Sequence, residues 1–128
     1  MNGPNYTAVH DVMTPDPLTI DGLAHVSQAI EIMRAEKVSS LVIEKRHDGD
    51  EWGLLTVHHI AAAVVGRDRS PDRASVYEVM AKPVLTVDAE MDIKYAVRLL
   101  ARFKLSRALV TEKGALVGIV TLRDMVLR

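Results

Sequence analysis

A threonine followed three residues later by an aspartate closes the last apolar segment of the chain, Gly118–Asp124. If this segment is a strand that passes directly into a helix after Val120, Thr121 is the N-cap residue and the first backbone N–H groups of the helix can face an anion. The Asp124 carboxylate could then accept hydrogen bonds from two neighbouring hydroxyls, such as those of a ribose. The pattern predicts a strand-to-helix corner that binds a phosphate and a sugar. The same two residues are also common where they only cap a helix and stabilise its first turn.

The composition is that of one small soluble protein. The chain has 128 residues, of which 48% are apolar and 26% charged, and no apolar run approaches the ~20 residues that cross a bilayer. Its start lacks the basic and apolar blocks of a secretory signal, and the absence of cysteine excludes disulfides and thiolate chemistry, so we expect a cytoplasmic protein without a membrane role. A formal net charge of −1 argues against a nucleic-acid partner.

The elements that must position the corner occur twice. When Met13 is placed on Met80, two halves of the chain align, with further identities at Leu18/Leu85, Thr19/Thr86, Asp21/Asp88, Ala29/Ala96, Lys37/Lys104 and Ser39/Ser106. Each half reads as a short helix ended by proline, a β-branched segment, an amphipathic helix, two strands joined by a glycine-containing hairpin, and a final helix. In the first half we expect that final helix over Val57–Val65, with Gly66 as its left-handed C′ residue.

The repeat sets the expected architecture. We expect one unit over residues 8–66, a polar linker over 67–74 and a second unit over 75–128. Neither unit can easily bury its apolar sheet face alone. The sequence therefore predicts a mixed α+β fold, in which two βαββα-type units pack sheet to sheet about a pseudo-twofold axis.

The ordered double occurrence of these motifs resembles the CBS domain, and the tandem resembles the CBS pair, or Bateman module. The motifs that carry the resemblance are Val12–Pro15 and Val79–Pro83, the runs Val38–Ile43 and Leu105–Val110, and Gly118–Asp124. The resemblance implies a stand-alone regulatory or sensor module that binds an adenosine-type ligand in the cleft between the repeats. That ligand is AMP, ADP or ATP, with S-adenosylmethionine or NAD as further options. The resemblance also implies a homodimer and a regulated protein supplied in trans.

Residue by residue, the resemblance places phosphate at Thr121 and ribose at Asp124. The segments that enclose the base and reach the phosphates are expected at Lys82, Pro83 and Val84 and at Ser106, Arg107 and Ala108. Arg107 and Arg123 are the expected charge partners of phosphate, because a guanidinium chelates phosphate oxygens.

The first copy departs from this pattern. Thr56 is retained, but His59 stands in place of the aspartate and Ser40 in place of Arg107. A neutral histidine forms one hydrogen bond where a carboxylate accepts two, so we expect one competent site in the second repeat and a weaker or empty one in the first.

Two other functions are weighed. A ligand-free dimeric interaction or assembly module with vestigial clefts is the alternative, because the first corner is altered and the helix Ile60–Val65 is apolar almost all round. An enzyme is not expected, since the chain has no cysteine and no glycine-rich phosphate loop. No metal site is expected either, because His58 and His59 are consecutive and project about 100° apart on a helix. The pattern fits parallel and antiparallel dimers alike.

Overall fold

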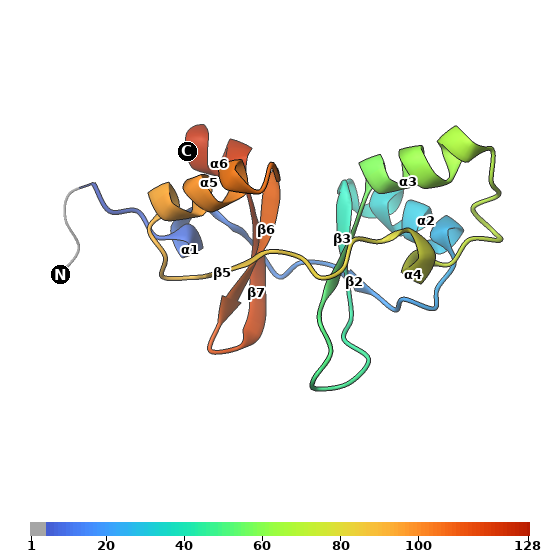
Figure 1. The fold of residues 1–128 in the computed structure, drawn as a ribbon, viewed down its shortest axis with the longest axis horizontal. Coiled ribbons are helices and arrows are strands. Elements are labelled where there is room, and N and C mark those ends of the chain that lie inside the picture. Colours follow the sequence, from blue (N-terminus) through green and yellow to red (C-terminus); the bar gives the residue numbers. More distant parts are fainter. Residues whose placement is uncertain (1–4) are drawn as a thin grey trace. The chain divides into compact units, whose positions relative to one another are not determined.

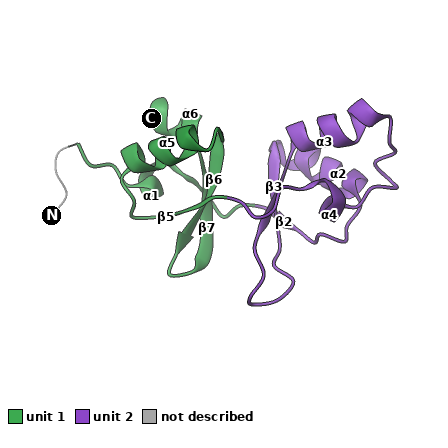
Figure 2. Cartoon of the chain, viewed as in Figure 1, with its two compact units in different colours: residues 1–17, 85–128 green, residues 18–84 purple. Residues whose placement is uncertain are grey.

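The computed structural model describes residues 5–128 (Figure 1). Its elements group into two compact units, which Figure 2 shows in separate colours. Unit 2 is Leu18–Val84, and unit 1 combines the part of the chain before Leu18 with Leu85–Arg128. Among the described residues, no helix is long and apolar enough to span a bilayer.

Unit 2 is a three-stranded sheet covered by helices. Its strands run in the order β2 (Thr19–Ile20), β3 (Ser40–Ile43), β4 (Gly53–Thr56), with β2 parallel and β4 antiparallel to β3. Its helices are α2 (Val26–Glu36), α3 (Val57–Ala63), the 3₁₀ turn η1 (Val65–Arg67) and α4 (Val76–Val79). Leu41, Leu55 and Val76 are fully buried, so the sheet and the helices share one apolar core.

Unit 1 has a four-stranded sheet in the order β1 (Thr14–Pro15), β7 (Ala115–Thr121), β6 (Arg107–Glu112), β5 (Thr86–Asp88). Its helices are α1 (Val9–Val12), α5 (Ile93–Arg102) and α6 (Leu122–Val126). Val9, Leu100 and Val120 are fully buried in its core. The mixed α+β class and the repeated order of elements, both predicted from the sequence, are confirmed.

The opening segment of each repeat packs with the strands of the other repeat. In unit 1, Thr14 pairs with Ile119 and Pro15 with Gly118. In unit 2, Ala81 bridges to Leu54, with both backbone N–H groups donating at 2.9 Å. The compact units therefore differ from the sequence repeats, because each repeat contributes its first helix to the other unit.

A glycine on a strand makes room for each exchanged segment. A Cβ at Gly53 would lie 2.6 Å from Met80 Sδ, and a Cβ at Gly118 would overlap Met13 Sδ and lie 2.8 Å from the Thr14 carbonyl oxygen. The two glycines thus accept the aligned methionines, Met80 and Met13, in the same way. This explains why Gly and Met recur together in both copies.

One predicted helix end is wrong. α3 stops at Ala63, and Gly66 lies inside the turn η1 instead of serving as a left-handed C′ residue. The left-handed residue is Asp68, with φ 56°. Gly66 is required for a different reason: a Cβ there would lie 2.9 Å from the Ala61 carbonyl oxygen.

Candidate functional site

The Thr121–Asp124 corner is built as a reciprocal helix cap. β7 passes directly into α6, and Thr121, with φ −116° and ψ 161°, is the N-cap residue as predicted. Thr121 Oγ1 accepts a hydrogen bond from the Asp124 N–H at 3.0 Å, and Asp124 Oδ2 accepts one from the Thr121 N–H at 3.0 Å. The cap uses one carboxylate oxygen, and no described residue donates a hydrogen bond to Oδ1.

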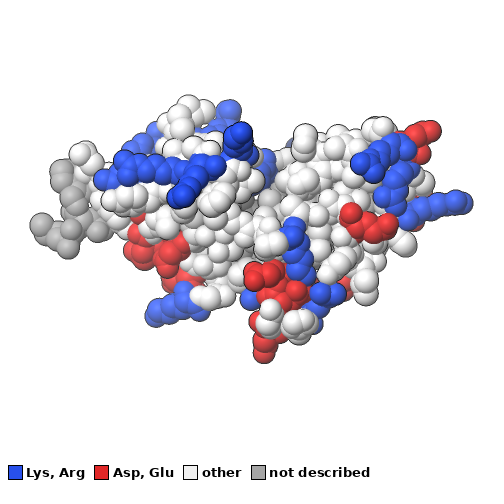
Figure 3. Space-filling model, viewed as in Figure 1, with Lys and Arg blue, Asp and Glu red and all other residues white. Residues whose placement is uncertain are grey.

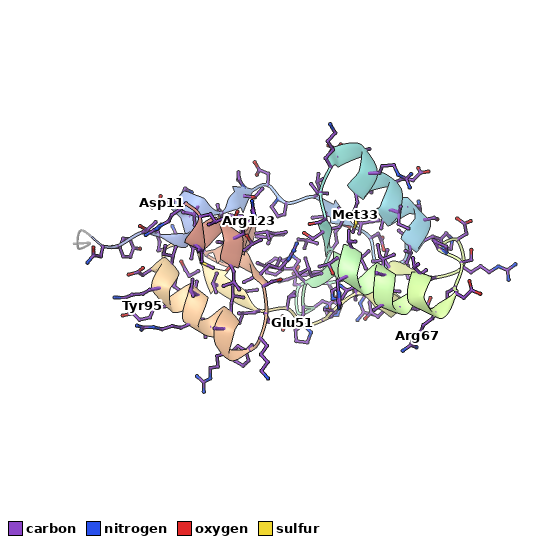
Figure 4. All side chains as sticks on the ribbon, turned by 90° about the horizontal axis from the view of Figure 1, so that it is seen from above. Asp11, Met33, Glu51, Arg67, Tyr95 and Arg123 are labelled. Carbon is purple, nitrogen blue, oxygen red and sulfur yellow. The ribbon has the colours of Figure 1, made fainter. Side chains whose placement is uncertain are left out.

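A cavity of about 450 Å³ borders this corner within unit 1. It is lined by Asp11 and Val12 of α1 and by Arg123, Asp124, Leu127 and Arg128 at the end of the chain. Figure 4 labels Asp11 and Arg123, which lie on the neighbouring helices α1 and α6. The lining of the cavity therefore combines two carboxylates, those of Asp124 and Asp11, with the guanidinium groups of Arg123 and Arg128. Only one oxygen of Asp124 is engaged in the helix cap.

Two of the other predicted residues adjoin the corner through the sheet. Arg107 begins β6 and is the register partner of Thr121. The Ser106 carbonyl accepts a hydrogen bond from the Leu122 N–H at 2.9 Å, so the start of β6 is fixed to the start of α6. Ala108, the next residue of β6, is fully buried and belongs to the core of unit 1. Unit 1 thus brings Ser106, Arg107 and Thr121 together.

Lys82, Pro83 and Val84 belong to unit 2, and their contact with a ligand at Thr121 stays a prediction. Lys82 Nζ lies 2.7 Å from Asp50 Oδ1, and Arg46 Nε lies 3.2 Å from Asp50 Oδ2. The Lys82 ammonium, together with the Arg46 backbone N–H, holds the pKa of Asp50 well below its usual value of 3.8. Lys82 therefore has a carboxylate partner on the β3–β4 hairpin, which sequence reasoning did not foresee.

The corner of the first repeat has the same geometry with a different hydrogen-bonding group. Thr56 Oγ1 accepts from the His59 N–H at 3.2 Å, and His59 Nδ1 accepts from the Thr56 N–H at 3.0 Å. Because Nδ1 is the acceptor, Nε2 carries the proton of the neutral ring. Where Asp124 has a second acceptor oxygen, the neutral His59 ring therefore has no second acceptor. Ser40 is the register partner of Thr56, as Arg107 is of Thr121.

Sequence reasoning missed Asp11 and Val12 as lining residues. Both belong to the opening helix of the first repeat, whereas the corner belongs to the second. The aligned motifs Val12–Pro15 and Val79–Pro83 were visible in the sequence, but they carry no signal that each packs with the other repeat. Only the tertiary structure places α1 against α6.

A family model described as the CBS domain matches residues 9–66 and again residues 76–128. The chain belongs to the CBS domain family. Its two matches are the two copies that the self-comparison detected, so the resemblance noted in the sequence is confirmed. CBS domain proteins are in general regulatory modules.

Several known proteins resemble this chain over most of its length. The solved hexameric CBS-CP12 protein from bloom-forming cyanobacteria is 33% identical, with a TM-score of 0.90 over 95% of this chain and 70% of that one. An uncharacterised protein of Methanopyrus kandleri is 31% identical over 92% of this chain, and the CBS domain-containing protein YhcV of Bacillus subtilis is 26% identical over 93% of this chain and 83% of its own length. The chain spans 58% of the Methanopyrus protein and 45% of a related Thermofilum pendens protein.

Proposed function

We propose that this CBS pair is a regulatory sensor that binds an adenosine-type ligand of the AMP, ADP or ATP class and transmits the binding to a partner protein. The carrying observation is that the cap at Thr121 uses only Oδ2 of Asp124, while the same carboxylate lines a cavity. One side chain can therefore cap α6 and accept a hydrogen bond from a sugar at the same time.

The ribose is the part of the ligand that Asp124 recognises. Its vicinal hydroxyls are donors, and a hydrogen bond to an ionised carboxylate oxygen is roughly twice as strong as one between two neutral groups. His59 has no acceptor left for a sugar hydroxyl at the equivalent place, because its Nδ1 is taken by the Thr56 N–H. The asymmetry supports a nucleotide site in the second repeat and a weaker or empty one in the first.

The phosphate is the part that the arginines recognise. Arg107 lies beside Thr121 in the sheet, and Arg123 is the second residue of α6. Neither guanidinium has an ion-pair partner among the described residues. Two unpaired guanidinium groups near a hydroxyl favour an anion with several oxygens, such as a phosphate.

A thermal-shift screen tests the proposal directly. The purified chain is melted with AMP, ADP, ATP, S-adenosylmethionine, NAD and adenosine, each with its matching counter-ion. A ligand at 100 times its Kd adds about 2.7 kcal/mol of stability, which raises the Tm of a domain of this size by on the order of 10 °C. The absence of a concentration-dependent shift with every one of these compounds would refute the proposal.

A second candidate is an assembly module, favoured by the exposed apolar side chains beside α3. Val57 is 53% exposed and Val65 is 68% exposed, with the exposed Ala61 and Ala62 between them. A similar protein, the cyanobacterial CBS-CP12 protein, is hexameric. Sedimentation velocity separates the candidates: Val57→Arg should lower the association state of an assembly module, whereas Val38→Arg, at a residue that is also partly exposed, should not.

A further inference from the structure

Unit 2 contains a larger cavity at a place that the nucleotide corner does not use. It measures about 610 Å³ and is lined by the turn Asp21–Leu23, the end of β3 with its following residues, Ile43–Arg46, and by Ser75 and Tyr77 at the start of α4. Ser40, at one end of β3, pairs with Thr56, whereas Ile43, at the other end, pairs with Gly53. The cavity therefore lies at the end of the strand remote from the Thr56–His59 corner.

Part of its lining is apolar. It includes Leu23, which is 81% exposed, Tyr77, which is 36% exposed, and the buried Ile43. Gly22 allows the tyrosine to approach, since a Cβ there would lie 2.9 Å from Tyr77 Cδ2, and its carbonyl accepts from the Tyr77 N–H at 2.9 Å. A cavity of this size with apolar side chains in its lining is in the range of small-molecule sites.

The polar groups around it offer unused donors. The Arg46 guanidinium lies 4.9 Å from the Tyr77 ring centroid and Lys45 Nζ lies 4.0 Å from that of Trp52. Neither Lys45 Nζ nor the two Nη atoms of Arg46 form a hydrogen bond with any described residue. Figure 3 shows acidic and basic side chains interleaved near the β3–β4 hairpin.

Two carboxylates also line the cavity, and each uses one oxygen in a hydrogen bond within unit 2. Asp21 Oδ1 accepts from the Leu23 N–H at 2.8 Å, and Glu44 Oε1 accepts from the Thr19 hydroxyl at 3.1 Å. A molecule that enters the cavity therefore meets two cations whose Nζ and Nη atoms form no hydrogen bond with a described residue, two carboxylates already held within unit 2, and apolar side chains. An anionic group can pair with the two cations while a flat apolar body contacts the apolar side chains.

The internal repeat shows that the fold does not require these walls. The alignment that places Met13 on Met80 also places Leu23 on Glu90, Gly22 on Ala89 and His10 on Tyr77. Unit 1 thus carries charged or polar groups where unit 2 has an exposed leucine and a tyrosine. Leu23 and Tyr77 are therefore particular to unit 2 and not a requirement of the repeated fold.

We propose that the unit 2 cavity binds a small aromatic carboxylate, with the ring between Leu23 and Tyr77 and the carboxylate on Arg46 and Lys45. The site is separate from the Thr121–Asp124 corner and does not depend on nucleotide binding there.

The sole tryptophan of the chain, Trp52, provides the readout because Lys45 stacks on it. The probe is 2-naphthoate, titrated into ¹⁵N-labelled protein while the single indole N–H signal is followed by NMR. We expect a saturable shift with a Kd of about 1 mM or lower, the range for a ligand of this size. The neutral 2-naphthylmethanol, with the same ring system, should bind at least fivefold more weakly.

Three variants locate the site. Leu23→Glu, which introduces the residue of the aligned position in unit 1, and Arg46→Met should each raise the Kd for 2-naphthoate at least fivefold. Tyr95→Ala is the matched control, because Tyr95 also lies between two cations, Lys94 at 5.2 Å and Arg98 at 5.5 Å, but on the exposed face of α5. It should leave the Kd unchanged.

Three outcomes would overturn the proposal. These are no saturable shift up to the solubility of 2-naphthoate, an unchanged Kd in Leu23→Glu, and equal affinity for the acid and the alcohol. Leu23 is exposed, so this variant retains its fold and keeps the test decisive even if Arg46→Met loses stability with its Asp50 contact. Asp124→Ala should bind 2-naphthoate normally, which separates this site from the proposed nucleotide site.

Discussion

Replacing Asp124 by asparagine separates the helix-cap role of this residue from its proposed ligand role. Asparagine keeps one carbonyl oxygen, which can still accept from the Thr121 N–H at the 3.0 Å seen for Oδ2. Its second polar atom becomes an NH₂ group, which donates where Oδ1 would accept. Asp124→Asn should therefore fold with nearly the stability of the wild type, whereas Asp124→Ala should lose about 1 kcal/mol with the cap.

The effect on ligand binding follows from the lost charged acceptor. A hydrogen bond to a charged group contributes about 1.5–3 kcal/mol, so the Kd for the nucleotide should rise by roughly 10- to 150-fold. At a concentration of 100 times the wild-type Kd, the ligand stabilises the wild type by about 2.7 kcal/mol and should stabilise Asp124→Asn by only about 0.3–1.3 kcal/mol. Differential scanning calorimetry with and without nucleotide measures both quantities.

His59→Ala is the matched control for Asp124→Ala. It removes the acceptor of the Thr56 N–H at the equivalent cap of α3, so it should cost similar stability without changing the nucleotide-induced shift. The reasoning fails if Asp124→Asn retains the full nucleotide shift. It fails equally if His59→Ala abolishes that shift while folding normally.

Three more predictions concern the charge and packing around these sites. In calorimetric titrations, Arg107→Met should raise the Kd for AMP roughly 10-fold or more and leave the Kd for adenosine unchanged, because the guanidinium is proposed to contact only the phosphate. An equal loss of affinity for both ligands would contradict this. Gly118→Ala should destabilise the fold by about 1–3 kcal/mol in urea unfolding, because its methyl group would overlap Met13 Sδ, whereas Gly49→Ala, with no neighbour closer than 3.7 Å, should be nearly neutral. The pKa of Asp50 is lowered chiefly by Lys82, so the stabilising effect of Asp50 is complete above the usual carboxyl pKa of 3.8 and declines as the pH falls below it. In Asp50→Asn, the urea midpoint should therefore depend less on pH between pH 5 and pH 2 than in the wild type. An unchanged pH dependence would show that other carboxylates dominate.

The sequence predicts well the features that depend on residues close together in the chain. The helix α2 and the strands β3 and β4 follow from local periodicity, and Thr121 as an N-cap follows from a hydroxyl at a strand-to-helix junction. Lys37 and Lys104, identical in the alignment, both have φ 56° near the ends of α2 and α5, so even a left-handed turn is repeated. The mistaken end of α3 has a non-local cause, since Gly66 is selected by its approach to the Ala61 carbonyl.

The features that the sequence left undetermined depend on contacts between distant segments. Asp50 reads as a solvated hairpin residue, yet its side chain is 8% exposed and holds both Lys82 and Arg46. Nothing in the residue types near Asp50 indicates those partners. The same holds for the unit 2 cavity, whose walls come from three segments that only the fold assembles.

The exchange of opening segments explains why the candidate site cannot be assigned to one repeat. The corner residues Thr121 and Asp124 come from the second repeat, but Asp11 and Val12 of the first repeat complete the cavity beside them. β1 pairs with β7 at the edge of its sheet, and the absence of a side chain at Gly118 leaves space for Met13. A second repeat without residues 8–17 would expose the edge of β7 and lose one wall of the cavity. The duplicated sequence therefore encodes two units that each contain segments of both copies, and a ligand bound at the Thr121–Asp124 corner would contact residues of both repeats.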